Sequence, residues 1–211
     1  MSKLYSVLWS ICFLLMVKPV SAIGNNAAPS WKAGVARVVI TPQERLWMAG
    51  YASRDHVAEG TLQDLWAKAL VLEDAGGKRC VLITLDLCGI PKDMSDYIRG
   101  QLKLKYKLEK AQIIINSSHT HSGPVVANAV QNAYDLSQEQ TQKIKSYTDQ
   151  LSKQIIQLAG DAIKSLEPAE VFTGNGFARF QVNRRNNNEP FLLIQPELNG
   201  PDDYAVPVIK V

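Results

Sequence analysis

The sequence predicts an α/β (α+β) fold: a layered domain with a mostly mixed β-sheet flanked by helices. Short apolar runs rich in β-branched residues alternate with two longer segments of helical periodicity. The run 79–87 is almost continuously apolar, which is typical of a strand in the middle of a sheet that is covered on both faces. Gly76 and Gly77 separate this run from the preceding one and indicate a hairpin turn.

The individual elements follow from the same patterns. Pro91 suits the first turn of a helix, where its missing N–H costs nothing. A longer helix is expected further on, because one apolar stripe recurs along a polar segment. Strands are predicted at 35–40, 65–73, 79–87, 111–116, 170–174, 191–194 and 204–211, and helices at 91–105 and 137–166.

The N-terminal segment has the layout of a secretory signal peptide. Lys3 precedes an apolar run, 4–17, and small residues lead to a cleavage point after Ala22. The run is shorter than the ~20 residues of a membrane-spanning helix. We therefore expect a signal peptide at 1–22, a linker at 23–33, an exported protein (periplasmic or secreted), and no transmembrane span after cleavage.

The net charge and the point at which the chain ends give two further expectations. Loss of Lys3 and Lys18 with the signal lowers the formal net charge from +3 to +1, and no Lys/Arg block with interleaved aromatics occurs, so a nucleic-acid partner is not expected. The chain stops inside the predicted strand 204–211. We therefore expect 34–211 to be the incomplete N-terminal part of a larger domain.

Two cysteines remain after signal cleavage, and we predict that both are free and buried. Cys80 and Cys88 lie at the two ends of the run 79–87. An extended chain would separate them by about 26 Å at ~3.3 Å per residue. A disulfide needs Cα atoms within about 7 Å.

Two of the three histidines, His119 and His121, follow the apolar strand around 113–115. In an extended chain, residues i and i+2 face the same way, so both imidazoles should reach one site at the end of the strand, where open α/β sheets bind ligands. Imidazole is a common zinc ligand, and a catalytic zinc takes three protein ligands and leaves one position open. The alternative is a pair of structural, hydrogen-bonded histidines.

Two other families that use a His-x-His pair fit this sequence less well. Gly123 stands where metallo-β-lactamase-like hydrolases carry an Asp, and the pair comes too late in the chain for an amidohydrolase barrel.

The segment 118–124, Ser-His-Thr-His-Ser-Gly-Pro, resembles the neutral/alkaline non-lysosomal ceramidase family. Further segments agree with the family in order, and the resemblance spans about 34–211. They are the strand at 34–42, the Met-Ala-Gly-Tyr turn at 48–51, Gly60 with the strand at 65–72, and Asn-Arg-Arg at 183–185. Val-Val-Ala at 125–127 departs from the family, in which glycines commonly follow the motif.

The resemblance implies roles for four residues. His119 would be a ligand of Zn²⁺, and His121 would be a catalytic and substrate-binding residue beside it. Gly50 would let the substrate approach the backbone, and Arg184 would bind a polar substrate group. The remaining zinc ligands, a His, a Glu and a Tyr, are expected beyond Val211, so the chain by itself should be inactive. Asp86 could orient a ligand histidine or cap the helix that follows.

The implied function is zinc-dependent hydrolysis of the N-acyl amide bond of ceramide-like lipids, which gives a sphingoid base and a fatty acid. The expected partner is a lipid amide substrate at a membrane surface. Two alternatives stay open. The domain could act on another amide or ester, or it could be a catalytically silent exported binding domain.

Overall fold

The computed structural model describes residues 30–129, 133–187 and 198–211. The predicted signal peptide and the predicted strand at 191–194 lie outside these residues. The strands are β1 Trp31–Val39, β2 Trp66–Glu73, β3 Arg79–Leu85, β4 Ile113–Ser117, β5 Glu167–Ala169, β6 Phe172–Phe177 and β7 Ala205–Lys210. The helices are α1 Lys92–Tyr106, the short 3₁₀ helix η1 Lys110–Gln112, and α2 Gln138–Lys164.

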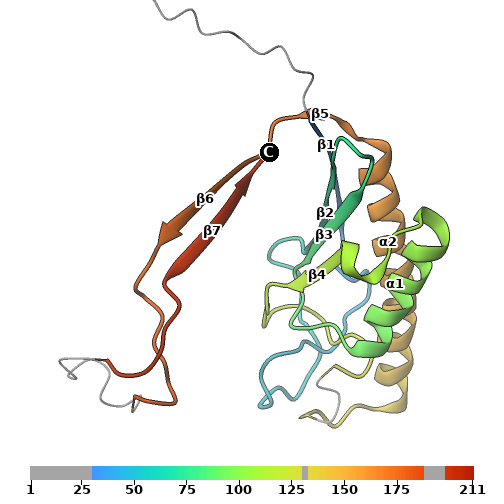
Figure 1. The fold of residues 1–211 in the computed structure, drawn as a ribbon. Coiled ribbons are helices and arrows are strands. Elements are labelled where there is room, and N and C mark those ends of the chain that lie inside the picture. Colours follow the sequence, from blue (N-terminus) through green and yellow to red (C-terminus); the bar gives the residue numbers. More distant parts are fainter. Residues whose placement is uncertain (1–29, 130–132, 188–197) are drawn as a thin grey trace, which may run out of the picture.

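The strands form a mixed five-stranded sheet of order β4-β3-β2-β1-β5, which confirms the predicted α/β class. Neighbouring strands are antiparallel except for β3 and β4, which are parallel. A parallel pair needs a crossover, and α1 provides it. Helices α1 and α2 lie together on one face of the sheet (Figure 1).

The core lies between this sheet face and α2. Alternate residues of β2 and β3 are buried, and they pack with the apolar stripe of α2, including Leu151 and Ile155. A Cβ on Gly34 would stand 2.0 Å from the backbone oxygen of Ala162, so glycine in β1 allows the sheet to approach the helix closely.

The prediction that both faces of β3 are covered is wrong for the described residues. Cys80 and Thr84 are exposed and Leu82 is half-buried, because both helices lie on the opposite face. Across the open face Leu82 pairs with Leu70 of β2 and with Ile114 of β4. The apolar run in the sequence thus places side chains on both faces of β3, although only one of these faces is packed against helices. The two cysteines are free, as predicted, but Cys80 is exposed and Cys88 is half-buried rather than buried.

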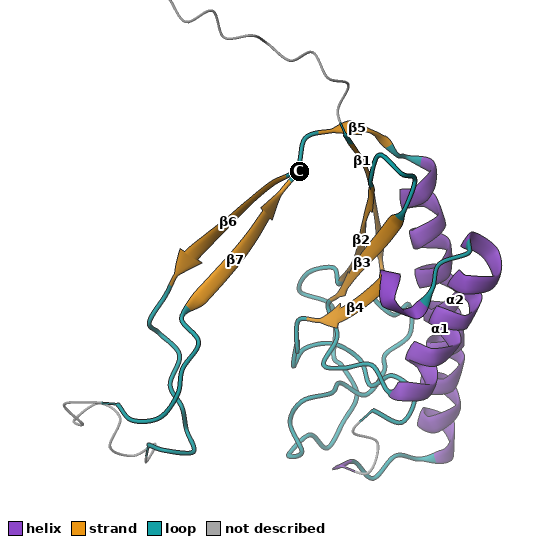
Figure 2. Cartoon of the chain, viewed as in Figure 1, coloured by secondary structure: helices purple, strands orange, loops and turns teal. Residues whose placement is uncertain are grey.

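The predicted strand at 170–174 corresponds to β6 alone, and the structure adds a short strand before it, β5, with a different partner. β5 pairs with β1 at the edge of the sheet, whereas β6 pairs with β7 in a separate antiparallel hairpin. Every residue of β6 and β7 is exposed. We call residues 172–210 the arm and the sheet with its two helices the body (Figure 2).

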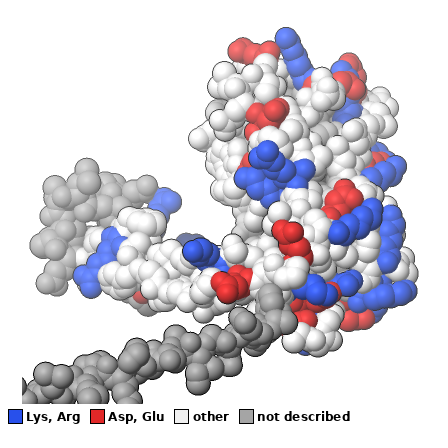
Figure 3. Space-filling model, turned by 90° about the horizontal axis from the view of Figure 1, so that it is seen from above, with Lys and Arg blue, Asp and Glu red and all other residues white. Residues whose placement is uncertain are grey.

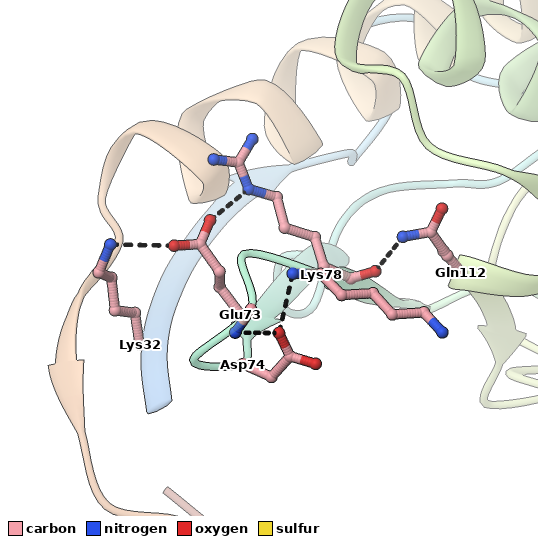
Figure 4. A network of polar contacts seen from close by, with 7 residues as sticks. Lys32, Glu73, Asp74, Lys78 and Gln112 are labelled. Atoms are coloured by element: carbon pink, nitrogen blue, oxygen red, sulfur yellow. Dashed lines mark hydrogen bonds and ion pairs between the residues drawn. The ribbon is translucent and has the colours of Figure 1, made fainter. Parts of the chain in front are cut away.

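The predicted hairpin turn between β2 and β3 is confirmed, and Asp74 organises it. The Asp74 carboxylate accepts hydrogen bonds from the backbone N–H groups of Gly76 and Lys78, each at 2.9 Å. Gly77 has φ +77°, a conformation that glycine adopts without a steric penalty. The turn brings the ends of β2 and β3 into register (Figure 4).

A buried carboxylate ties the same end of the sheet together. Glu73 accepts hydrogen bonds from Arg79 Nε at 2.6 Å and from Lys32 Nζ at 3.0 Å (Figure 4). Glu73 is 6% exposed. The guanidinium of Arg79, followed by the Lys32 ammonium, lowers the pKa of Glu73 below its ordinary value.

The surface of the body carries charges of both signs (Figure 3). Basic and acidic side chains are interspersed over the face of the body that Figure 3 displays. Among the described residues, no helix is both long enough and apolar enough to cross a membrane.

Candidate metal centre

The candidate site lies at the edge of the sheet where the parallel strands β3 and β4 both end. Their pairing continues into the following loops, since Ser118 N–H donates to Leu85 O at 3.0 Å and Thr120 N–H donates to Leu87 O at 3.1 Å. The segment after β3 and the segment after β4 therefore run side by side. Cys88 and His119, which are 31 residues apart in sequence, become neighbours.

The two histidine rings lie together, as predicted. The ring centroids of His119 and His121 are 4.7 Å apart, with an interplanar angle of 67°. His119 is exposed and His121 is half-buried, so neither ring is enclosed in the hydrocarbon core.

The reason for this proximity differs from the prediction. Strand alternation does not apply, because β4 ends at Ser117 and both histidines lie beyond it. His119 instead adopts φ +58°, in the left-handed region, and a turn begins at His121. Non-glycine residues in this region are uncommon and concentrate at functional sites.

A backbone carbonyl orients the His119 ring. Its Nδ1 lies 2.7 Å from Cys88 O, and a carbonyl only accepts, so Nδ1 carries the proton. The Nε2 atom then keeps its lone pair. Histidines that bind metals are typically held in this way, with one ring nitrogen hydrogen-bonded to the protein and the other free for the ion.

Cys88, a third possible ligand, was not identified from the sequence, which predicted only that it is free and buried. Its Sγ lies 3.7 Å from His119 Nδ1. The same rule that placed the histidines at the strand end also applies to Cys88, which directly follows the predicted strand 79–87. Applied to both strands, it would have found this residue.

The donor set fits a zinc ion. One ligand atom from each of Cys88, His119 and His121 can be chosen so that all three lie within 4.8 Å of one another. Bond lengths of ~2.3 Å to sulfur and ~2.0–2.1 Å to nitrogen in a tetrahedral site require ligand atoms roughly 3.3–3.6 Å apart. The limit of 4.8 Å is wider than this spacing, so the three side chains would have to move closer together to share one ion.

The loop between β1 and β2 packs over the histidine turn. Ala49 N–H donates to Gly123 O at 2.9 Å, and Met48 pairs with Pro124. Gly50 has φ +111°, and a Cβ there would stand 2.3 Å from His121 Cγ. Glycine at this position therefore allows both the backbone conformation and the space for the imidazole. The predicted role of Gly50 in substrate binding stays a prediction.

Two further residues of this loop contact His121, and the sequence analysis assigned a role to neither, although Tyr51 belongs to the turn at 48–51. The Tyr51 ring meets the His121 ring edge-on with centroids 4.8 Å apart. Arg54 donates from Nη2 to His121 O at 2.7 Å, and its guanidinium lies 5.4 Å from the centre of the Tyr51 ring. Together these two residues contact both the ring and the backbone of His121.

Asp86 has neither of its predicted roles. Its Oδ2 accepts a hydrogen bond from Trp66 N–H at 2.9 Å, while Asp86 N–H donates to Trp66 O at 3.0 Å. The carboxylate thus extends the β2–β3 pairing by one residue. The following helix has Pro91 at its N-cap, five residues later.

Arg184 lies in the loop after β6, where its side chain is exposed. Asn183 organises this loop by accepting hydrogen bonds from the N–H groups of Arg185 and Asn186. The loop stands at the end of the arm, away from the sheet edge at which β4 ends (Figure 1). The structure therefore does not bring Arg184 to the two histidines, and its role in binding substrate stays a prediction.

His56, the third histidine, is exposed. It contacts Asp55 at 2.6 Å and Glu59 at 3.6 Å in the loop between β1 and β2. This makes His56 a suitable control residue for the other two histidines.

Comparisons with known proteins agree on one family. Residues 31–188 match the family model described as "Neutral/alkaline non-lysosomal ceramidase, N-terminal". The chain is 28% identical over 191 residues to the neutral ceramidase of Pseudomonas aeruginosa, covering 86% of this chain and 27% of that protein. It is 30% identical over 133 residues to neutral ceramidase B of Dictyostelium discoideum, covering 61% of this chain and 18% of the relative.

A solved structure gives the same result. The crystal structure of the Pseudomonas aeruginosa neutral ceramidase matches with a TM-score of 0.64 and 25% identity, covering 86% of this chain and 29% of that one. The chain thus spans little more than a quarter of the length of these Pseudomonas proteins.

Proposed function

Since the chain belongs to the neutral/alkaline non-lysosomal ceramidase family, we propose that the protein carrying it hydrolyses the N-acyl amide bond of ceramide-like lipids in a zinc-dependent reaction. The products are a sphingoid base and a fatty acid. The observation that supports this proposal most directly is the accessible pair His119 and His121, with rings 4.7 Å apart, in the Ser-His-Thr-His-Ser-Gly-Pro segment.

His119 would hold the zinc ion through Nε2, because Nδ1 is engaged by the Cys88 carbonyl. When bound, the ion supplies Lewis-acid activation of a carbonyl and lowers the pKa of its water to about 7. His121 lies beside this position and is the residue that can donate a hydrogen bond to the amide or to a hydroxyl of the substrate. Arg54 and Tyr51 fix the place of His121, so its ring is oriented before substrate arrives.

The substrate contacts proposed for Gly50 and Arg184 differ in their support. Gly50 already lies against His121, so a substrate at that ring would also meet the backbone at residue 50. Arg184 would have to approach the sheet edge from the arm. The predicted signal peptide at 1–22 supports export of the protein. An exported protein would meet a lipid amide substrate at a membrane surface.

The test is metal content and ceramide hydrolysis of the protein that carries this chain, measured as released fatty acid. His119→Ala should lose bound zinc and lower the rate at least ~100-fold, since even changes to residues that only support a ligand cost 10–100-fold. His56→Ala, outside the site, should retain both properties. Full hydrolysis by the metal-free protein would refute the proposal.

Assays with other substrates separate the alternatives. Simple N-acyl amides and acyl esters without a sphingoid base should react much more slowly than ceramide. A preference for either would indicate a related hydrolase with another substrate. Zinc binding without hydrolysis of any of them would indicate the catalytically silent binding domain.

A further inference from the structure

We propose that Tyr51 is a substrate-binding residue, whose phenol hydroxyl forms a hydrogen bond with a hydroxyl group of the lipid beside the scissile amide. This inference deepens the proposed function at the same site, and it rests on that function for the position of the substrate. It gives Tyr51 a direct contact with the lipid in addition to its contact with His121.

The order of the aromatic rings places Tyr51 close to the reacting atoms. The His121 ring contacts the His119 ring, with centroids 4.7 Å apart, and the Tyr51 ring, with centroids 4.8 Å apart. A lipid whose amide carbonyl lies at His119 and whose neighbouring groups pass His121 would meet Tyr51 next. In a ceramide, both hydroxyl-bearing carbons are bonded to the carbon that carries the amide nitrogen. A substrate hydroxyl would therefore lie within a few bonds of the amide, where Tyr51 can reach it.

The Tyr51 ring is held in a fixed place and is nevertheless exposed. Its ring meets His121 edge-on at an interplanar angle of 84°, and the Arg54 guanidinium lies 5.4 Å from the ring centre. The backbone is also constrained, because Arg54 N–H donates to Tyr51 O at 3.3 Å. The residue is still 56% exposed. A side chain that is already fixed loses little further freedom when a ligand binds to it, so Tyr51 is pre-organised for such a contact.

The Tyr51 hydroxyl is available for a ligand. Within the part of the chain that the structure describes, this hydroxyl makes no hydrogen bond with the protein. Tyr147 differs, since its hydroxyl lies in the core and donates to Ile40 O. A phenol hydroxyl can both donate and accept a hydrogen bond, and so can an alcohol group of a lipid. The two groups are therefore suited to each other.

A purely supporting role is the main competing explanation, because the Tyr51 ring packs against His121. Tyr51→Phe separates the two explanations. This variant keeps the ring and its contacts with His121 and Arg54, and it removes only the oxygen atom. Support of His121 needs the ring alone, whereas the proposed contact with the lipid needs the hydroxyl.

The first experiment measures kcat and KM of the protein that carries this chain on ceramide and on two analogues, each of which lacks one of the two hydroxyls. Tyr51→Phe should lower kcat/KM for ceramide about 3–10-fold, the usual effect of one neutral hydrogen bond. For the analogue without the partner hydroxyl, the variant and the wild type should agree within about twofold, as in a double-mutant cycle. Tyr97→Phe, an exposed tyrosine of α1, is the matched control and should leave all three substrates unaffected.

A second measurement needs no turnover. The probe is a short-chain ceramide in which a sulfonyl group replaces the amide carbonyl, so that both hydroxyls remain and no carbonyl is present to be hydrolysed. Tyr51→Phe should raise the Kd of this probe about 3–10-fold, and Tyr97→Phe should leave it unchanged.

The outcomes separate this inference from the proposed function. Equal losses of kcat/KM on ceramide and on both analogues would show that Tyr51 acts only through His121 and would overturn the inference. A Kd of the sulfonyl probe that is unchanged in Tyr51→Phe would also overturn it. Binding of the probe that depends on the Tyr51 hydroxyl, in a protein that hydrolyses no ceramide, would support the contact and refute the proposed reaction. A protein that neither hydrolyses ceramide nor binds the probe would refute both.

Discussion

The body and the arm use the same backbone pairing but differ in what lies behind the strands. In the body, one sheet face packs on α2, and side chains such as Ile83 and Leu151 are 0% exposed. In the arm, every residue of β6 and β7 is exposed, including Phe172 at 53% and Val208 at 51%. A two-stranded hairpin without a packed face is at best marginally stable in water. Strand pairing thus sets the register in both regions, whereas hydrophobic burial stabilises only the body.

The largest expected difference between the two regions concerns apolar truncation. Leu151→Ala removes a fully buried side chain and should lower the free energy of unfolding by about 2–5 kcal/mol. Val208→Ala in the arm should change it by less than about 0.5 kcal/mol. Urea unfolding of both variants checks this, and equal losses would show that the arm is packed as firmly as the core.

Two glycine-to-alanine substitutions should also distinguish the two regions, because one should lower the free energy of unfolding and the other should not. Gly34→Ala places a Cβ 2.0 Å from Ala162 O, so β1 and α2 must separate, at a cost of about 1–3 kcal/mol. A Cβ at Gly174 in β6 meets no atom within 4 Å, and alanine there should be neutral or slightly stabilising, because it restricts the unfolded chain. A destabilising Gly174→Ala would contradict the exposed position of the arm.

A smaller effect is expected from a buried hydroxyl. Tyr147 donates from its hydroxyl to Ile40 O, and burial raises the pKa of Tyr147 above its ordinary value. Tyr147→Phe leaves that carbonyl without this donor and should cost about 1–2 kcal/mol in thermal or urea unfolding. Tyr204→Phe, in the segment that leads into β7, is the arm counterpart and should cost less. A larger loss of stability in Tyr204→Phe than in Tyr147→Phe would show that the stronger polar contact lies in the arm.

The smallest effect is a change in the pH dependence of stability. Arg79, and then Lys32, lower the folded-state pKa of Glu73 below its ordinary value of 4.5. A lowered pKa contributes stability above the unfolded-state value, and this contribution is lost as the pH falls through the folded-state value. Glu73→Gln should therefore lower the melting temperature at neutral pH and flatten its decrease below about pH 4.5. Parallel curves for both proteins would show that the network adds no pH-dependent stability.

The fold class and most elements could be predicted because they depend on local patterns. The crossover helix, the long helix and the β2–β3 hairpin differ from their predicted bounds by only a few residues. The open face of β3 could not be predicted, since an apolar run records which residues tolerate burial but not whether another layer is present. The separation of β5 from β6 also depends on the partners of each strand, which are distant in sequence.

The part of the site that depends on the position of a strand in the sequence could be predicted. The histidine pair belongs at a strand end, and its proximity is confirmed, although His119 reaches it through a left-handed backbone conformation rather than through strand alternation. The contacts of Tyr51 and Arg54 with His121 could not be predicted, because a loop far away in sequence brings these residues to His121. Cys88 could have been found by asking which residues leave the neighbouring parallel strand.

The parallel pairing of β3 and β4 has a consequence for how the chain unfolds. The backbone hydrogen bonds from Ser118 to Leu85 and from Thr120 to Leu87 close the segment between the two strands, which contains α1. Closing such a segment costs entropy, and that cost is recovered only while both strands stay paired. The crossover helix and the histidine turn should therefore lose their order together rather than one after the other.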